Sequence, residues 1–280
     1  MTDNITLSTE AVVGDATAAS PTAEKTDNEA QAMSLLLHNR NATYAFLSRL
    51  FRVEVDEDLY DTLKIMEFPT HTGCDLADEG YRQMWEYLST AKGDVITSLA
   101  VDYVRAFIGS GNTGYSAAYP FESVYTSPKR LLMQDARDDV LDLYHAAGLE
   151  KRDDWKDSED HIALELEYMQ ILGERAANAY DHRNDAECQR NLLCQKHFLE
   201  DHLYAWYPMM ASDMEKFPKT LFYQGLGKLT HGFLRSDLDL LQELLPDALD
   251  SAANANVDSP SDNSCASDSV GTATSHAKAC

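Results

Sequence analysis

The chain has 280 residues and a formal net charge of −24 at pH 7, from 47 acidic and 23 basic side chains. This length fits one large domain or two small ones. An acidic surface repels the phosphates of nucleic acids and anionic lipids and attracts basic segments, so we expect no nucleic acid partner. The chain has no run of about 18 consecutive apolar residues, so we expect no stable insertion into a membrane. The N-terminal stretch lacks a secretory pattern, which indicates a cytoplasmic protein.

Both ends of the chain are polar and lack apolar periodicity. Residues 1–28 are rich in Thr, Ala, Asp and Asn, and residues 247–280 are rich in Ser, Ala and Asp. Such segments cannot bury enough apolar area to offset the entropy lost on ordering. We therefore expect a disordered N-terminal tail, one globular domain over residues 29–246, and a disordered acidic C-terminal tail.

The first predicted helix has one apolar stripe with a charge inside it. The apolar side chains share one helix face with Arg40; they are Met33, Leu37, Tyr44, Leu47 and Phe51. A charge that faces a protein core needs a partner of opposite sign. We therefore expect Arg40 to pair with a buried carboxylate, with Glu165 and Glu167 as candidates.

Further helices are predicted along most of the chain. Apolar spacing and turn residues place them at about residues 56–67, 75–90, 94–108, 127–147, 157–180, 188–206 and 219–244. Ser127-Pro128 supplies a helix N-cap and first-turn proline, and Pro208 is expected to end the helix before it. No segment shows convincing strand alternation. The fold class is therefore all-α, a single globular helical bundle with a long loop near residues 109–127.

Residues 109–114 match the glycine pattern G-x-G-x-x-G of dinucleotide-binding proteins. That motif needs a strand before it and a helix after it. Here a helical pattern precedes it and a loop follows, so we expect neither a nucleotide site nor a bound cofactor. The chain also lacks the G-x-S-x-G pattern of serine hydrolases.

Glu159-Asp160-His161 stands at the start of an apolar helix. With Asp157 as N-cap, Asp160 falls at the third helical position and completes a capping box. His161 lies one turn before Glu165 on the same face. That pair supplies two metal ligands, whereas a catalytic zinc needs three. Capping is the favoured role and a binding site the second, while a metal-dependent hydrolase using His161, Glu165 and another ligand is a further alternative.

The segment Tyr119-Pro120-Phe121-Glu122-Ser123-Val124-Tyr125 is an aromatic loop with a proline and a carboxylate. Rings in such a loop commonly pack onto the bundle. The alternative is a groove wall that receives an apolar helix beside basic residues. In that case the side chains that can hold guanidinium groups are Glu122, Glu159, Asp160 and Glu165.

Several blocks, taken in chain order, carry a resemblance to a known family. They are Asp102-Tyr103-x-Arg105-x-Phe107, Tyr119-Pro120-x-Glu122-Ser123-Val124-Tyr125, Glu159-Asp160-His161-Ile162-x-x-Glu165-x-Glu167-Tyr168-Met169 and Phe198-x-x-x-His202-Leu203-x-x-Trp206. Over residues 33–245 the chain resembles the TorD/DmsD family of molybdoenzyme maturation chaperones. Ser158 and Phe121 depart from the pattern, since the family often has proline and tryptophan there.

The resemblance implies a cytoplasmic, all-helical chaperone that is not an enzyme. Its partner would be the twin-arginine signal peptide on the catalytic subunit of a DMSO-reductase-like molybdoenzyme, which is held until molybdopterin is inserted and then exported. The candidate peptide-binding residues are Tyr119, Pro120, Phe121, Glu122, Ser123, Tyr125, Glu159, Asp160, His161 and Glu165. Another chaperone role stays open, the assembly of a nitrate-reductase-type subunit that is not exported. A monomer and a domain-swapped dimer are both compatible with the sequence.

Overall fold

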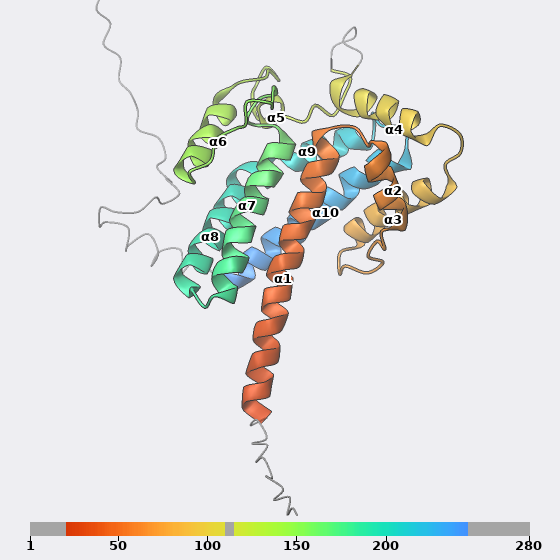
Figure 1. Cartoon of the computed structure of the whole chain (residues 1–280). Coiled ribbons are helices and arrows are strands. Elements are labelled where there is room, and N and C mark those ends of the chain that lie inside the picture. Colours follow the sequence, from red (N-terminus) through yellow and green to blue (C-terminus); the bar gives the residue numbers. More distant parts are fainter. Residues whose placement is uncertain (1–20, 110–114, 246–280) are drawn as a thin grey trace, which may run out of the picture.

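The computed structural model describes residues 21–109 and 115–245, and the regular secondary structure in these ranges is helical (Figure 1). The helices are α1 (Pro21–Arg52), α2 (Glu57–Ile65), α3 (Asp75–Thr90), α4 (Val95–Tyr103), α5 (Glu122–Thr126), α6 (Asp135–Ala146), α7 (Ile162–Asp181), α8 (Asp185–Phe198), α9 (Tyr204–Met214) and α10 (Leu221–Leu244), with π-helical turns η1 (Val104–Ile108) and η2 (Leu199–Leu203). The predicted all-α class is confirmed. Among the described residues, no helix is long and apolar enough to cross a membrane.

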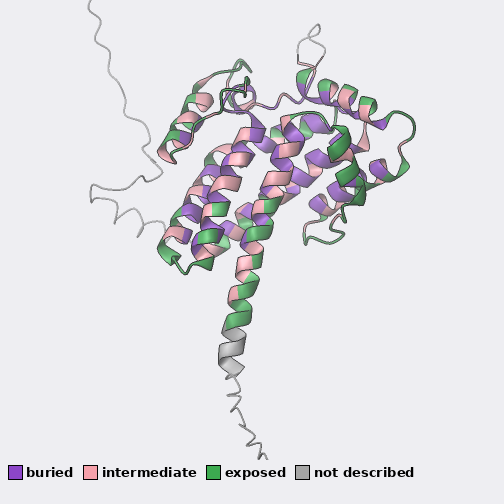
Figure 2. Cartoon of the chain, viewed as in Figure 1, coloured by how far each residue is buried: buried purple, intermediate pink, exposed green. Residues whose placement is uncertain are grey.

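The core lies where α1, α7 and α8 pack side by side and α10 runs from α8 to α3 (Figure 1). The apolar stripe predicted for α1 faces this core, and Leu47 and Phe51 have no exposed surface. Leu166 and Met169 of α7 are equally buried opposite them. Figure 2 shows exposed residues along the N-terminal part of α1, which projects beyond the packed helices. Burial of the stripe therefore holds the C-terminal half of α1 in the bundle.

Glycines allow α3 and α10 to approach each other closely. A Cβ atom on Gly80 would lie 2.4 Å from the backbone nitrogen of Leu229. A Cβ atom on Gly225 would lie 2.6 Å from the carbonyl oxygen of Gly80. Side chains at these positions would overlap backbone atoms, which cannot rotate away, so only glycine allows this spacing.

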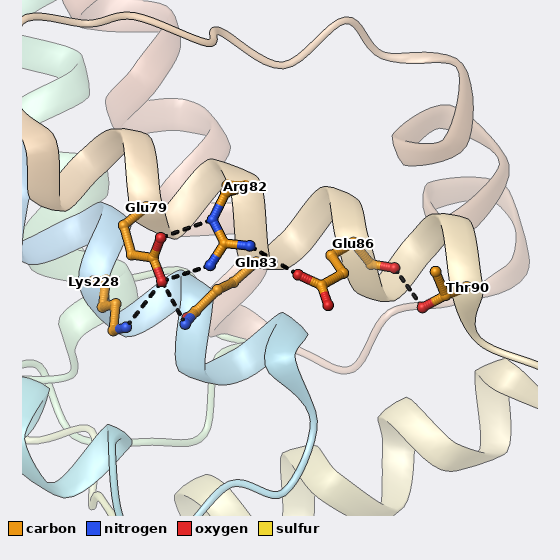
Figure 3. Close-up of polar contacts among 6 residues, drawn as sticks. All are labelled: Glu79, Arg82, Gln83, Glu86, Thr90 and Lys228. Atoms are coloured by element: carbon orange, nitrogen blue, oxygen red, sulfur yellow. Dashed lines mark hydrogen bonds and ion pairs between the residues drawn. The ribbon is translucent and has the colours of Figure 1, made fainter.

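A ladder of polar contacts runs along α3 and reaches α10 (Figure 3). The guanidinium of Arg82 donates to Glu79 at 2.8 Å and to Glu86 at 2.9 Å. Glu79 also accepts from Gln83 at 2.9 Å and lies 3.4 Å from the ammonium of Lys228 on α10. Exposed pairs of this kind contribute only about 0.2–1 kcal/mol each. The ladder therefore orients α3 beside α10, while the close packing supplies most of the attachment.

Arg40 is buried in an ion pair, as expected, but its partner is Asp237 of α10. The Nε atom of Arg40 donates to Asp237 Oδ1 at 2.5 Å, and the Tyr44 hydroxyl donates to Oδ2 at 2.6 Å. The expectation of Glu165 or Glu167 was wrong. Glu167 pairs instead with Arg52, at the end of α1. Arg40 lies twelve residues earlier, which is about 18 Å along the helix, too far from the start of α7.

The starts of α1, α6 and α7 differ from their predicted positions. α1 begins at Pro21, inside the stretch expected to be disordered. α6 begins at Asp135, because residues 127–134 form turns in which Arg130 and Met133 have positive φ angles of 52° and 56°. α7 begins at Ile162, and its N-cap is His161 in place of Asp157. Local cap signals placed the starts of α6 and α7 too early, because contacts between distant segments decide where these two helices begin.

Pro208 lies inside α9, which continues to Met214, so the prediction that it ends a helix was wrong. The π-helical turn η2 directly precedes α9, and proline is best tolerated near the start of a regular helix. A second π-helical turn, η1, follows α4 within the range predicted as one helix. No local sequence signal predicts these widened turns.

Some predicted features lie partly or wholly outside the described residues. These are residues 1–20 and 247–280 of the two expected tails, residue 246 of the expected domain and residues 110–114 of the glycine pattern. The described segment before that pattern is helical, which agrees with the expectation that it lacks the strand of a dinucleotide site. The division into a domain at 29–246 and two disordered tails stays a prediction.

Substituting Asp237 by alanine is expected to lower the free energy of unfolding by about 3–5 kcal/mol, because it leaves the Arg40 charge and the Tyr44 hydroxyl buried without their partner. Urea unfolding followed by circular dichroism measures this change. Asp239→Ala, on the exposed side of the same helix, is the matched control and should change stability by less than about 0.5 kcal/mol. Equal effects of the two substitutions would contradict the role of the buried pair.

Candidate functional site

The aromatic loop and the Glu-Asp-His turn, which are far apart in the sequence, lie side by side and pair through their backbones. Phe121 and His161 form an isolated antiparallel bridge. The Glu122 amide donates to the Asp160 carbonyl at 3.0 Å, and the Ile162 amide donates to the Pro120 carbonyl at 2.9 Å. The structure thus brings together the two segments that the sequence singled out. We call residues 119–125 and 158–162 together the paired segments.

Asp160 and His161 each cap a helix within the paired segments. Asp160 has no exposed surface, and its Oδ2 accepts from the Ser123 amide at 2.9 Å, so it caps α5 in place of the predicted capping box on α7. His161 Nδ1 accepts from the Ala163 amide at 3.0 Å, which leaves the ring proton on Nε2. Burial, assisted by the nearby Arg52 charge, lowers the pKa of His161 to about 3. His161 is therefore a neutral cap at neutral pH.

The His161 ring is held between two other rings. Phe121 packs edge-on against it with centroids 5.0 Å apart, and Trp155 does so from another side at 5.1 Å. The guanidinium of Arg52 lies 5.3 Å from the centre of the Trp155 ring and forms an ion pair with Glu167. The paired segments are thereby connected to the end of α1. Neither Trp155 nor Arg52 was predicted, because their contacts join segments that no local pattern links.

Glu159 is held by two bases of the same chain. Its carboxylate lies 2.6 Å from Arg137 Nε and 2.8 Å from Lys151 Nζ. Burial opposes ionisation, but Arg137 and Lys151 together lower the pKa of Glu159 to about 2. Glu159 therefore stays charged and fixes α6 and the segment after it against the paired segments.

Glu122 and Glu165 form a second buried acidic group with His202 and Trp206. His202 Nδ1 lies 3.2 Å from a Glu122 oxygen, and the Trp206 indole donates to Glu165 at 3.0 Å. Burial and the neighbouring Glu122 raise the pKa of Glu165 well above its usual range. Burial also raises the pKa of Glu122, despite the opposing effect of His202. The pair therefore keeps a proton to higher pH than isolated carboxyl groups do, with the larger shift on Glu165.

The four predicted guanidinium-binding carboxylates, Glu122, Glu159, Asp160 and Glu165, are at most 7% exposed, and each contacts other groups of the chain. Ser123 and Pro120 are buried as well. Tyr119, Phe121 and Tyr125 are half-buried and form the more accessible part of the predicted set. Tyr125 stacks on Trp206 with centroids 5.5 Å apart. Most of the predicted residues therefore build and hold the site from inside.

A groove of about 440 Å³ opens beside the paired segments. Aromatic and aliphatic side chains line much of it, with charged groups among them: Arg52, Val53, Tyr144, Leu149, Glu150, Lys151, Arg152, Asp154, Trp155, Leu164, Glu167, Tyr168 and Ile171. Trp155 belongs both to this groove and to the ring contacts of His161. A larger pocket of about 820 Å³ lies between α2 and α3, shares no lining residue with the groove and includes the exposed Ile65 and Trp85.

The geometry does not favour metal binding by His161 and Glu165. Within residues 21–109 and 115–245, no group of three or more His, Cys, Asp or Glu side chains is placed to hold a metal ion. The Nδ1 lone pair of His161 is used by the Ala163 amide. The raised pKa of Glu165 disfavours loss of its proton, whereas a metal ligand must lose its proton.

The raised pKa of Glu165 predicts that stability falls as pH rises. The unfolded chain releases this proton near the ordinary value of 4.5, and the folded chain keeps it to higher pH. Above that value the free energy of unfolding should decrease by up to about 1.4 kcal/mol per pH unit from this group. Glu165→Gln keeps an acceptor for Trp206 but removes the titration. Urea unfolding at about pH 5 and pH 8 should show that the free energy of unfolding falls more for the native protein than for the variant. Identical pH dependence of the two proteins would contradict this.

The sequence is similar to known proteins. A family model described as "Nitrate reductase delta subunit" matches residues 74–212. The "Chaperone protein TorD" of Vibrio cholerae serotype O1, strain El Tor Inaba N16961, is 28% identical over 224 residues, which cover 76% of this chain and 97% of that protein. The proteins of the same name from Vibrio parahaemolyticus and Shewanella pealeana are 23% and 25% identical and are covered over 96% and 91% of their lengths.

These relatives are chaperones, which are not enzymes, so the expectation that the chain is no enzyme is confirmed and the hydrolase alternative is wrong. The match to the relatives extends over almost their whole length. The chain therefore belongs to the nitrate reductase delta subunit family that includes the TorD chaperones, as the resemblance in its sequence predicted.

Proposed function

We propose that this chaperone binds the twin-arginine signal peptide on the catalytic subunit of a DMSO-reductase-like molybdoenzyme. It holds that subunit in the cytoplasm until molybdopterin is inserted, and export follows. Membership of the TorD chaperone family supports this function. So does the net charge of −24, which attracts a basic peptide over long range.

The groove beside the paired segments is the proposed peptide site. A twin-arginine signal peptide has adjacent arginines followed by an apolar segment. The groove offers Leu149, Leu164 and Ile171 to the apolar segment, and its carboxylates Glu150 and Glu167 to the arginines. The observation that carries the assignment is Trp155, which lines the groove and packs against His161 of the predicted site.

The predicted residues act in this site mainly as its support. Asp160 caps α5, His161 caps α7, and Glu159 holds α6 through Arg137. These contacts fix the segment that carries Trp155, so the groove is formed before a peptide arrives. Preformed sites avoid part of the entropy cost of binding.

A second candidate is an assembly chaperone for a nitrate-reductase-type subunit that is not exported. The description of the matching family model favours it. Its partner peptide would lack the paired arginines, and the same groove would then depend on its apolar lining.

Calorimetric titration with twin-arginine signal peptides from molybdoenzymes of the same genome is expected to give tight binding to one of them. Replacing the two arginines by alanines should weaken that binding about 100-fold or more, because two charge-assisted contacts are lost. Tight binding that ignores the arginines would favour the second candidate. No binding of any signal peptide would contradict the proposed function.

Leu164→Asp is expected to weaken binding of the same peptide about tenfold or more, because it places a charge against the apolar segment. Ile65→Asp is the matched control, since Ile65 is 83% exposed in the pocket between α2 and α3. Thermal unfolding of both variants checks that they remain folded. A larger loss from Ile65→Asp than from Leu164→Asp would place the peptide in the other pocket.

A further inference from the structure

Arg52 occupies a cradle made of a carboxylate and an aromatic ring. Its guanidinium lies 5.3 Å from the centre of the Trp155 ring and is ion-paired with Glu167. The Arg52 side chain is 29% exposed and that of Glu167 is 36% exposed, so water reaches both. All three residues line the groove. We call Glu167 and Trp155 the guanidinium cradle.

This combination of groups is suited to any arginine side chain. A guanidinium donates to a carboxylate and stacks on an aromatic face, and tryptophan offers the strongest such face. The cradle is held in place from behind, because Trp155 packs against His161, and Glu167 lies in the first two turns of α7. The Trp155 ring and the helix that carries Glu167 are therefore held by contacts that do not involve Arg52.

Other arginines near the paired segments are held differently. Arg137 shares the nearly buried Glu159 with Lys151, and the Glu159 side chain is only 9% exposed. Arg152 pairs with Asp154, but their side chains are 81% and 70% exposed, which makes this a weak surface pair. Among the described residues, Arg52 is the arginine that combines a carboxylate partner with an aromatic face.

We propose that the guanidinium cradle is the binding site for one arginine of the partner peptide, and that Arg52 fills it as a built-in competitor while the chaperone is free. This inference rests on the proposed peptide function. Arg52 is the last residue of α1, and its side chain can turn into solvent without unwinding the helix. The exchange keeps one ion pair and one ring contact in the cradle before and after binding. Arg52 therefore lowers the affinity of the groove for peptides, and it excludes peptides that have no arginine to replace it in the cradle.

The test compares Arg52→Gln with the native protein in calorimetric titrations with the twin-arginine signal peptide. If Arg52 fills the cradle about nine-tenths of the time, its removal should tighten binding about tenfold, because apparent affinity scales with the fraction of open sites. Glu167→Gln should weaken binding, and Arg52→Gln combined with Glu167→Gln should lose the gain. Arg49→Gln is the matched control, since Arg49 lies in the same last turn and forms its ion pair with the exposed Asp56 at 2.8 Å, outside the groove.

A small probe separates failure of this inference from failure of the proposed function. N-acetyl-diarginine amide is titrated into the same variants beside its dilysine counterpart. Tighter, arginine-selective binding to Arg52→Gln than to the native protein, lost on adding Glu167→Gln, supports the cradle even if no signal peptide binds. If the native protein binds a signal peptide through its arginines but Arg52→Gln binds it equally or more weakly, the competitor role is wrong and the peptide function stands. Absence of diarginine binding to every variant also overturns the cradle.

Discussion

The pairing between the aromatic loop and the Glu-Asp-His turn is the constraint on which the rest of the site depends. Backbone hydrogen bonds from Glu122 to Asp160 and from Ile162 to Pro120 join two segments that are far apart in the sequence. They set where α5 and α7 begin, and the caps supplied by Asp160 and His161 satisfy amides that those helix starts would otherwise leave unpaired. The position of Trp155, and with it the groove wall, follows from this pairing.

Acidic residues serve two separate purposes in this molecule. The buried ones are compensated from within: Glu159 by Arg137 and Lys151, Asp237 by Arg40, and Glu165 by the Trp206 indole and a raised pKa. Leaving any of them ionised and unpaired in the interior would cost several kcal/mol. Attraction of a basic partner is therefore left to the acids outside the interior, in a chain whose net charge is −24. The groove adds local selectivity to this general attraction.

Much of the helical framework could be predicted from the sequence, because apolar spacing alone determines which face of α1, α3 or α10 is buried. The two segments of the candidate site could also be named in advance. The roles of these residues could not be predicted. A sequence does not show that Asp160 caps α5, which is remote in the chain, or that Glu167 forms an ion pair with Arg52. The partner of Arg40 was missed for a related reason. The C-terminal end of α1 lies beside the start of α7, where Glu165 and Glu167 are, and Arg40 is about 18 Å away along α1. The π-helical turn that presents His202 has no local signature.

The tryptophans stand in three different surroundings, and this makes the protein's own fluorescence informative. Trp206 has no exposed surface and donates to Glu165, Trp85 is 58% exposed between α2 and α3, and Trp155 lies half-buried in the groove. A neutral dissolved quencher such as acrylamide therefore reaches Trp85 freely, Trp155 partly and Trp206 least. A molecule that fills the groove would shield Trp155 alone and leave the other two emissions unchanged. Trp155 is thus an intrinsic fluorescent reporter of groove occupancy, with the exposed Trp85 and the buried Trp206 as internal references.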